Sequence, residues 1–186
     1  MKIKNGWIDN AHKISSPNFD ERPPNCTPSL IVVHCISLPP GKFGGEAISQ
    51  LFMNKLPADK HPYFEEIHHL KVSSHILIRR DGALIQYVPF HARAWHAGKS
   101  IYEGQENCND FSVGIELEGT EEIAYTAKQY KQLSYVIKVL LDSYPSLSPS
   151  SITGHSDISP GRKTDPGPSF DWNYLRSLSN HPGAKT

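Results

Sequence analysis

The sequence predicts an α/β fold, a single domain in which helices pack on one mixed β-sheet. Three patterns favour this class: short apolar runs between polar segments, two such runs flanking a tight turn, and one long amphipathic stretch. Strand and helix patterns interspersed along one chain are typical of helices packed on a sheet. A chain of 186 residues can also bury a core without covalent staples. We expect an extended N-terminal arm (1–28) that belongs to the same domain, a main domain (29–178) and a tail (179–186).

Strands are expected where β-branched and apolar residues run together or alternate with polar ones. The run at 29–34 (SLIVVH) has the composition of a buried strand, and another short strand is expected to end at His155. At 72–89, two β-rich runs flank Asp81-Gly82, which predicts a hairpin with a tight turn. In the run at 112–119 (SVGIELEG), alternation places three apolar side chains on one face and two carboxylates on the other: Val113, Ile115 and Leu117 against Glu116 and Glu118.

Helices are expected at four places. The long one covers 126–144, with Thr126 as its N-cap and an apolar stripe made of Leu133, Val136, Ile137, Leu140 and Leu141. Shorter helices are expected at 46–56, at 62–70, where Pro62 suits the first helical position, and at 170–178. The segment 95–111 reads as irregular.

Composition excludes several classes of protein. Lys plus Arg and Asp plus Glu both number 19, so the formal net charge is zero, and neither a nucleic acid nor a membrane is expected as a partner. No apolar run approaches the roughly 18 residues that span a bilayer. The three cysteines form no CxxC pair, which is typical of reduced thiols, and the N-terminus lacks the apolar core of a signal peptide. We therefore expect a cytoplasmic protein. Its ten histidines hint at metal or acid–base chemistry.

The loop at 155–168 (HSDISPGRKTDPGP) combines many titratable groups with a stiff backbone. Pro166 favours an extended conformation at Asp165. If the extended run includes Lys163, then Lys163 and Asp165 point the same way and Thr164 points the opposite way. A cation and a carboxylate held rigidly toward one place are what a preorganised site needs.

Two histidines and a carboxylate would suit zinc. His34 and His155 each stand at the end of an expected strand, and with Asp165 they would leave a fourth zinc position open for water. From spacing alone, Asp157 competes with Asp165. The alternative for either histidine is a hydrogen-bonded residue at the sheet rim, and for Asp165 a turn residue.

The catalytic groups are equally open from pattern alone. A carboxylate on a neighbouring strand could take a proton from water, and Glu116 is the candidate, with Glu118 competing by the same alternation. Lys163 could stabilise a developing oxyanion, or it could be a solvated charge.

Several blocks of the sequence together resemble one family. They are VVHCISLPPGKFGG, VSSHILIRRDGALIQYVPF, RAWHAGKS, CNDFSVGIELEG and TGHSDISPGRKTDPGPSFDW. These blocks are similar to the AmpD-type N-acetyl-anhydromuramyl-L-alanine amidases, which share a zinc amidase fold with the peptidoglycan recognition proteins. The resemblance extends from the N-terminal arm to Trp172, and such long ordered blocks are far more specific than one short motif.

The resemblance implies an activity and a site. Its zinc ligands would be His34, His155 and Asp165, its catalytic base Glu116, and its transition-state cation Lys163. The enzyme would hydrolyse the amide between N-acetyl-anhydromuramic acid and L-alanine in anhydromuropeptides. It would act as a cytoplasmic monomer in peptidoglycan recycling and so lower the level of fragments that induce β-lactamase. Residues 29–178 would then be the zinc amidase domain.

Substrate contacts are less sharply indicated. Trp95 could stack on a sugar or belong to the core, and Tyr63 lies in a segment that borders the family's site. Lys71 and Arg93 could bind peptide carboxylates, while His96 and His75 are expected to be structural. We also expect a substrate contact at Asn107.

The chain departs from the family pattern at three positions. Cys35 replaces an asparagine, and Lys71 and Asn107 replace arginines, which puts peptide affinity in question. Alternation points Cys35 away from the metal if His34 points at it. The rival interpretations are a non-catalytic peptidoglycan-fragment recognition module, a zinc hydrolase of another amide, and a closed structural zinc with Cys35 as fourth ligand.

Overall fold

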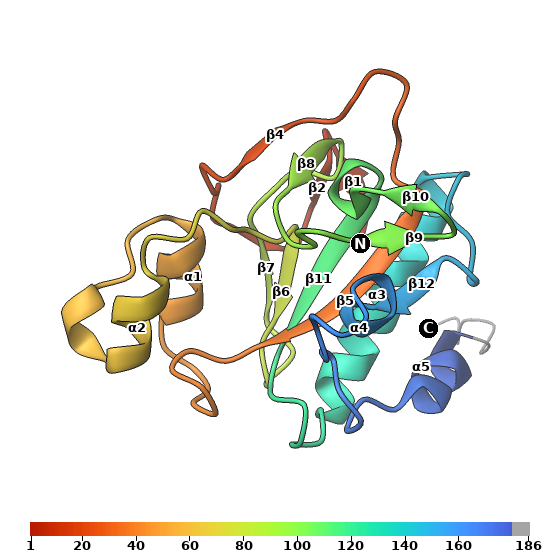
Figure 1. Cartoon of the computed structure of the whole chain (residues 1–186). Coiled ribbons are helices and arrows are strands. Elements are labelled where there is room, and N and C mark those ends of the chain that lie inside the picture. The colour runs from red at the N-terminus through yellow and green to blue at the C-terminus, as the bar shows by residue number, and fades with distance from the viewer. Residues whose placement is uncertain (180–186) are drawn as a thin grey trace.

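The computed structural model describes residues 1–179, which contain one six-stranded mixed sheet (Figure 1). The strand order is β12-β5-β11-β6-β7-β3. The first four strands run parallel, β7 is antiparallel to β6, and β3 is parallel to β7. Their bounds are β3 (His12–Lys13), β5 (Leu30–Ile36), β6 (Ile76–Ile78), β7 (Leu84–Gln86), β11 (Ser112–Glu118) and β12 (Ile152–Gly154). The mixed sheet confirms the predicted fold class.

The predicted hairpin is the β6–β7 pair. Gly82 takes a positive φ of 87°, a conformation that glycine adopts without a steric penalty. Asp81 supports the turn through its carboxylate, which accepts a hydrogen bond from the N–H of Ala83 at 2.9 Å. The Asp-Gly signal is therefore confirmed, together with the antiparallel pairing on either side of it.

One face of the sheet is covered by the long helix α3 (Ala127–Ser143), and the shorter helix α5 (Trp172–Ser179) packs against α3. The side chains of Val113, Ile115 and Leu117 are fully buried on this face. Helix α3 starts where the sequence predicts, because the Thr126 hydroxyl accepts from the N–H of Gln129 and the Gln129 side chain accepts from the N–H of Thr126.

Two short helices, α1 (Ala47–Phe52) and α2 (Pro62–Ile67), pack on the other face, against the hairpin. A 3-10 turn, η1 (Ala58–Lys60), precedes α2. Pro62 occupies the first turn of α2, as predicted. Helix α1 is shorter than the predicted 46–56, because Asn54 takes a left-handed backbone conformation (φ 57°), which ends a helix.

The N-terminal arm is extended but it is tied into the domain by short strands. These are β1 (Ile3–Lys4), β2 (Trp7–Ile8), β3 at the edge of the main sheet, and β4 (Phe19–Glu21), which pairs with β8 (Ala92–Ala94). The nearly buried Arg22 donates to the carbonyls of Phe90 and Ser112 and so joins the arm to the central strand β11.

The segment 95–111 is more regular than predicted. It contains a small hairpin, β9 (Ile101–Tyr102) and β10 (Gln105–Glu106), and the 3-10 turn η2 (Cys108–Asp110). The hairpin turn is Glu103-Gly104, with φ values of 48° and 84°. Positive φ at both central residues is the tight-turn geometry of a two-residue hairpin, and strands of two residues leave no alternation to detect.

The strand expected to end at His155 ends one residue earlier, at Gly154. His155 begins the short helix α4 (His155–Ile158). The carboxylate of Asp157 accepts from the N–H of Gly154 at 2.9 Å and from the hydroxyl of Thr153 at 2.7 Å. These bonds hold the junction between β12 and α4, so Asp157 stabilises the N-terminus of α4. The predicted tail (179–186) lies outside the described residues apart from Ser179. In the described part of the chain, no helix has the length and apolarity that a bilayer crossing needs.

Candidate active site

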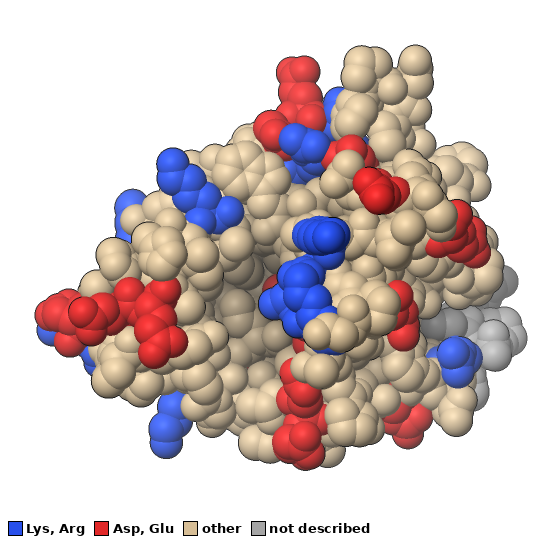
Figure 2. Space-filling model, in the orientation of Figure 1, with Lys and Arg blue, Asp and Glu red and all other residues tan. Residues whose placement is uncertain are grey.

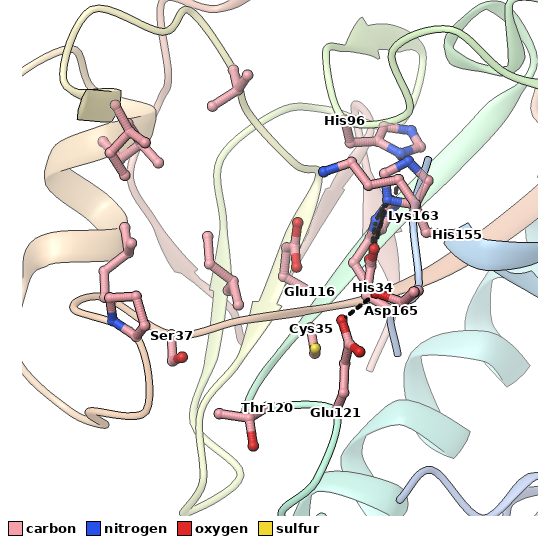
Figure 3. A pocket seen from close by; sticks show the side chains of 18 of the residues that line it. His34, Cys35, Ser37, His96, Glu116, Thr120, Glu121, His155, Lys163 and Asp165 are labelled. Carbon is pink, nitrogen blue, oxygen red and sulfur yellow. Dashed lines mark hydrogen bonds and ion pairs between the residues drawn. The ribbon is translucent and has the colours of Figure 1, made fainter. Parts of the chain in front are cut away.

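His34, His155 and Asp165 converge at the carboxyl ends of two neighbouring parallel strands (Figure 3). His34 lies near the end of β5, and His155 follows β12 directly. The two Nδ1 atoms are 3.0 Å apart, and Oδ2 of Asp165 lies 3.1 Å from each of them. Ligands commonly bind at this edge of a parallel sheet, where successive loops meet.

This donor set fits a zinc ion. Two imidazole nitrogens and one carboxylate oxygen face a single point, and all three ligand atoms lie within 4.8 Å of one another. Zinc accepts these ligand types in tetrahedral geometry, and a three-ligand set leaves one position open for water or substrate, as in catalytic sites.

The protonation states also suit metal binding. Burial lowers the pKa of His34 to about 4, so its imidazole is neutral near pH 7. Burial alone would raise the pKa of Asp165, but hydrogen bonds from His155 and His34 outweigh it and hold that pKa below its usual range. A neutral imidazole and an anionic carboxylate are the ligand forms that bind metal.

Glu116 stands beside this cluster on the neighbouring strand. It is the register partner of His34 on the adjacent strand β11, so both side chains leave the same face of the sheet. Among residues 1–179, no hydrogen-bond partner reaches its buried Oε2 atom. Burial and the nearby Asp165 raise its pKa well above the usual range. A buried carboxyl with a raised pKa and a free oxygen has the properties of a general acid–base group.

Glu118 lies on the same face but is fully engaged. Its Oε1 accepts from the N–H of Gly44 at 2.7 Å, and its Oε2 accepts from the N–H of Arg80 at 3.1 Å. It also forms an ion pair with Arg79 at 3.5 Å. Its carboxylate therefore joins the loop before α1 to the hairpin and is not free for chemistry.

Lys163 lines the same cavity from the loop after α4 and is exposed to solvent. The loop is held by its backbone, since the N–H of Lys163 donates to the carbonyl of Ser159 and that of Ser156 donates to the carbonyl of Asp165. The hydroxyl of Thr164 donates to Glu121 at 2.5 Å. Glu121 was not singled out from the sequence, because its partner is 43 residues further along the chain.

These groups open into a cavity of about 700 Å³ between the sheet ends and the α1–α2 region. Figure 2 shows the hollow, with basic side chains on the edge away from α1 and α2. Helices α1 and α2 and the segment after them supply an apolar wall made of Leu51, Phe52, Tyr63, Ile67, Leu70 and Val72. Trp95 also lines the cavity, and its indole N–H donates to Asp20 at 3.1 Å. Tyr63 and Trp95 are thus placed where a substrate could touch them.

Other residues with expected substrate contacts lie elsewhere. Of the described residues that line the cavity, none is Lys71, Arg93 or Asn107. Arg93 donates to both carboxylate oxygens of Asp20, at 2.7 and 2.6 Å, and to Asp110 at 2.5 Å, so its guanidinium is already paired with acids. Lys71 is exposed, and Asn107 is exposed at the start of η2. The substrate-binding roles predicted for these residues gain no support from the cavity.

Cys35 belongs to the opposite face of β5. It packs against the apolar core under α3, and in Figure 3 its sulfur is directed away from the two histidines. Burial raises the pKa of its thiol to about 12. Within residues 1–179, the converging ligand group comprises His34, His155 and Asp165 without Cys35. A closed four-ligand zinc site with Cys35 therefore lacks support.

The comparison with known proteins agrees with this arrangement. Residues 24–168 match the N-acetylmuramoyl-L-alanine amidase family, and the chain belongs to that family. It is therefore an amide hydrolase, and the family resemblance found in its sequence is confirmed.

Its relatives define a narrower group within the family. The chain is 56% identical over 178 residues to the 1,6-anhydro-N-acetylmuramyl-L-alanine amidase AmpD of Escherichia coli (strain K12), covering 96% of this chain and 97% of that protein. It is 49% identical over 177 residues to the AmpD of Haemophilus influenzae, covering 95% and 96% of the two chains. A crystal structure of an AmpD derivative superposes with a TM-score of 0.94 at 56% identity, covering 96% of this chain and 99% of that one. The fold is also that of Pseudomonas aeruginosa AmpDh3 solved with an anhydromuramic pentapeptide, with a TM-score of 0.64, 24% identity and coverage of 92% and 65%.

Proposed function

We propose that this chain hydrolyses the amide bond between N-acetyl-anhydromuramic acid and L-alanine in anhydromuropeptides, with zinc as its cofactor. The observation that carries the proposal is the buried carboxyl group of Glu116, whose Oε2 has no hydrogen-bond partner among residues 1–179, beside the converging atoms of His34, His155 and Asp165. The names of the relatives support the substrate, and the chemistry of the three ligands supports the metal.

His34, His155 and Asp165 would hold the ion at the base of the cavity. Zinc bound there supplies a Lewis acid that polarises the scissile carbonyl and makes a water molecule easier to deprotonate. The described site needs no further protein ligand for this role, because catalytic zinc sites keep one position open.

Glu116 moves the proton in the proposed reaction. Its carboxyl group takes a proton from the attacking water and later gives that proton to the nitrogen of the departing L-alanine. No hydrogen bond within the described part of the chain occupies its Oε2 atom. The raised pKa of Glu116 keeps the carboxyl a competent acid in the second transfer.

Lys163 balances charge in the proposed reaction. When water adds to the scissile amide, the carbonyl oxygen becomes negative. The ammonium of Lys163 at the cavity edge stabilises that oxyanion. The cavity of about 700 Å³ is of a size that holds a sugar with a short peptide. Tyr63 and Trp95 would contact the substrate from its walls.

We further propose that the enzyme acts as a cytoplasmic monomer in peptidoglycan recycling, and so removes fragments that induce β-lactamase. Three unpaired cysteines, Cys26, Cys35 and Cys108, are compatible with a reducing compartment. Light scattering of the purified protein tests the oligomeric state, and fractionation of cells that express the chain tests the compartment.

Mass spectrometry of the reaction tests the activity. Zinc-loaded protein is incubated with anhydro-N-acetylmuramyl-tripeptide, with and without a chelator, and Glu116→Gln protein is the control. Free tripeptide and anhydromuramic sugar, formed only without chelator and only by the unaltered protein, support the proposal. Release of acetate in place of tripeptide would indicate hydrolysis of another amide, and intact substrate that co-elutes with the protein would indicate recognition without turnover.

A further inference from the structure

His96 contacts the metal-binding histidine His34 from the side away from the converging atoms. Nε2 of His34 lies 2.9 Å from Nδ1 of His96, and the rings meet edge to face at 84°. The other ring nitrogen of His34, Nδ1, faces His155 and Asp165. An imidazole that binds a metal through Nδ1 carries its proton on Nε2. With zinc on Nδ1, His34 is therefore the donor in this pair and His96 is the acceptor.

The direction of this hydrogen bond also determines which ring nitrogen of His96 carries the proton. With Nδ1 acting as an acceptor, neutral His96 carries its proton on Nε2, which lies 3.1 Å from the hydroxyl oxygen of Ser112. Ser112 begins β11, the strand that also carries Glu116. A directed chain of hydrogen bonds thus runs from His34 through His96 to the central sheet.

The surrounding fold holds the His96 ring in this place. Gly114 lies on the same face of β11 between Ser112 and Glu116, and a Cβ atom there would overlap the His96 ring. The side-chain oxygen of Asn109 accepts from the N–H groups of His96 and Ala97, at 3.1 and 2.8 Å. Asn109 therefore holds the backbone of His96 and Ala97, and the missing side chain of Gly114 leaves room for the His96 ring.

Ala97, the residue after His96, contacts the second histidine, His155. The carbonyl oxygen of Ala97 lies 3.0 Å from Nε2 of His155, and Arg162 also donates to that oxygen at 2.5 Å. Two consecutive residues, His96 and Ala97, thus meet the outer nitrogens of both metal-binding histidines.

We propose that His96 is a positioning residue of the metal site, which holds His34 in the tautomer and orientation that present Nδ1 to zinc. The Ala97 carbonyl does the same for His155. Partners of this kind orient a metal ligand and raise its basicity, and their loss commonly costs about 10- to 100-fold in metal affinity. A neutral imidazole as partner adds no negative charge, so Asp165 stays the anionic member of the set. The inference rests on the proposed zinc site.

A matched pair of substitutions tests it. His96→Leu removes the acceptor, whereas His96→Asn keeps one, because the asparagine Oδ1 and the histidine Nδ1 are both attached to Cγ. The zinc dissociation constant is measured by competition with a chromophoric chelator. We expect a loss of about 10- to 100-fold in His96→Leu and a loss below tenfold in His96→Asn. A thermal melt of each metal-free variant checks that it is folded.

A second readout reports the tautomer directly. In ¹⁵N NMR spectra of the zinc-loaded protein, the proton shared by His34 and His96 should reside on Nε2 of His34 and couple through the hydrogen bond to Nδ1 of His96. Gly114→Ala displaces the ring without changing any imidazole and should weaken zinc binding as His96→Leu does.

The outcomes separate this inference from the proposed function. If the unaltered protein binds no zinc, both are wrong. If it binds zinc and a folded His96→Leu binds it equally well, only the role of His96 is wrong. If His96→Leu does not fold, the spectrum of the zinc-loaded unaltered protein decides. A shared proton on Nδ1 of His96, or no coupling between the two rings, would overturn the proposed direction, and a coupled proton on Nε2 of His34 supports it.

Discussion

Glu116 and His34 are register partners on the adjacent parallel strands β11 and β5, so the acid–base candidate and a metal ligand project side by side from one face of the sheet. Backbone hydrogen bonds of two buried strands set their spacing, and no flexible loop intervenes. Groups mounted on rigid elements keep their geometry better than groups on loops. His155 adds to this row because β12 pairs with the other edge of β5.

Replacing Glu116 with glutamine should remove most of the turnover and leave zinc binding intact. The amide keeps the size of the side chain but cannot take a proton from water. General acid–base groups contribute about 100- to 10,000-fold, so kcat should fall by that factor. Tripeptide release measured by mass spectrometry gives kcat, and elemental analysis gives the zinc content. Full activity of the variant would rule out the role of Glu116.

The same substitution should stabilise the metal-free protein increasingly as the pH rises. Burial and Asp165 raise the pKa of Glu116 in the folded state, so the unfolded chain loses its proton at a lower pH than the folded one. Between the two pKa values the folded state binds the extra proton, and the free energy of unfolding falls as pH increases. Glutamine does not titrate, so the free energy of unfolding of the variant lacks this fall with pH. Urea denaturation at pH 5 and pH 8 should show the advantage of Glu116→Gln growing at pH 8. Glu66→Gln, at an exposed position of α2, is the control. A constant difference would contradict the raised pKa.

Replacing Glu118 should lower the stability of the fold and leave the catalytic rate nearly unchanged. Its carboxylate accepts hydrogen bonds from the N–H groups of Gly44 and Arg80 and pairs with Arg79. Glu118→Gln turns one acceptor into a donor that faces an N–H group, and an unsatisfied buried group costs about 1–3 kcal/mol. Urea denaturation measures the loss, and kcat per folded molecule should stay within about tenfold of the unaltered enzyme. A loss of turnover as large as that of Glu116→Gln would reassign the catalytic carboxylate.

Removing the charge of Lys163 should lower kcat more than it raises KM. A group that stabilises an oxyanion acts mainly in the transition state, and the loss of one such interaction costs about 100- to 1,000-fold in kcat. Lys163→Met keeps the length of the side chain and removes the ammonium. Steady-state kinetics provide the measurement, and Lys131→Met, on the exposed side of α3, is the control. A change confined to KM would indicate that Lys163 only binds substrate.

Loss of Asp165 should abolish zinc binding, whereas loss of Cys35 should not. Asp165 supplies the anionic oxygen of the converging set, and Cys35 packs under the other face of β5. Equilibrium dialysis of Asp165→Ala and Cys35→Ala compares the two directly, and a chelator should stop turnover in the unaltered enzyme. Zinc retention by Asp165→Ala together with loss in Cys35→Ala would reverse the assignment.

The local elements follow from nearby residues. The capping box of α3 lies within four residues, the hairpin turn needs only Asp81 and Gly82, and the alternation at 112–119 is visible in the strand itself. Each depends on backbone geometry that a few adjacent side chains control. The fold class, the family and the candidate ligands could therefore be predicted from the sequence.

The choices that sequence left open depend on partners far along the chain. Glu116 and Glu118 look alike by alternation, and they differ because Gly44, 74 residues away, and Arg80, 38 residues away, occupy one carboxylate and not the other. Likewise Asp165 meets His34 across 131 residues, whereas Asp157 accepts hydrogen bonds from Thr153 and Gly154 at the end of β12. His96 reads as a structural residue until the fold brings its ring against His34, 62 positions earlier. The local patterns thus decide which side chains could act, whereas long-range packing decides which of them are left free and which are already bonded.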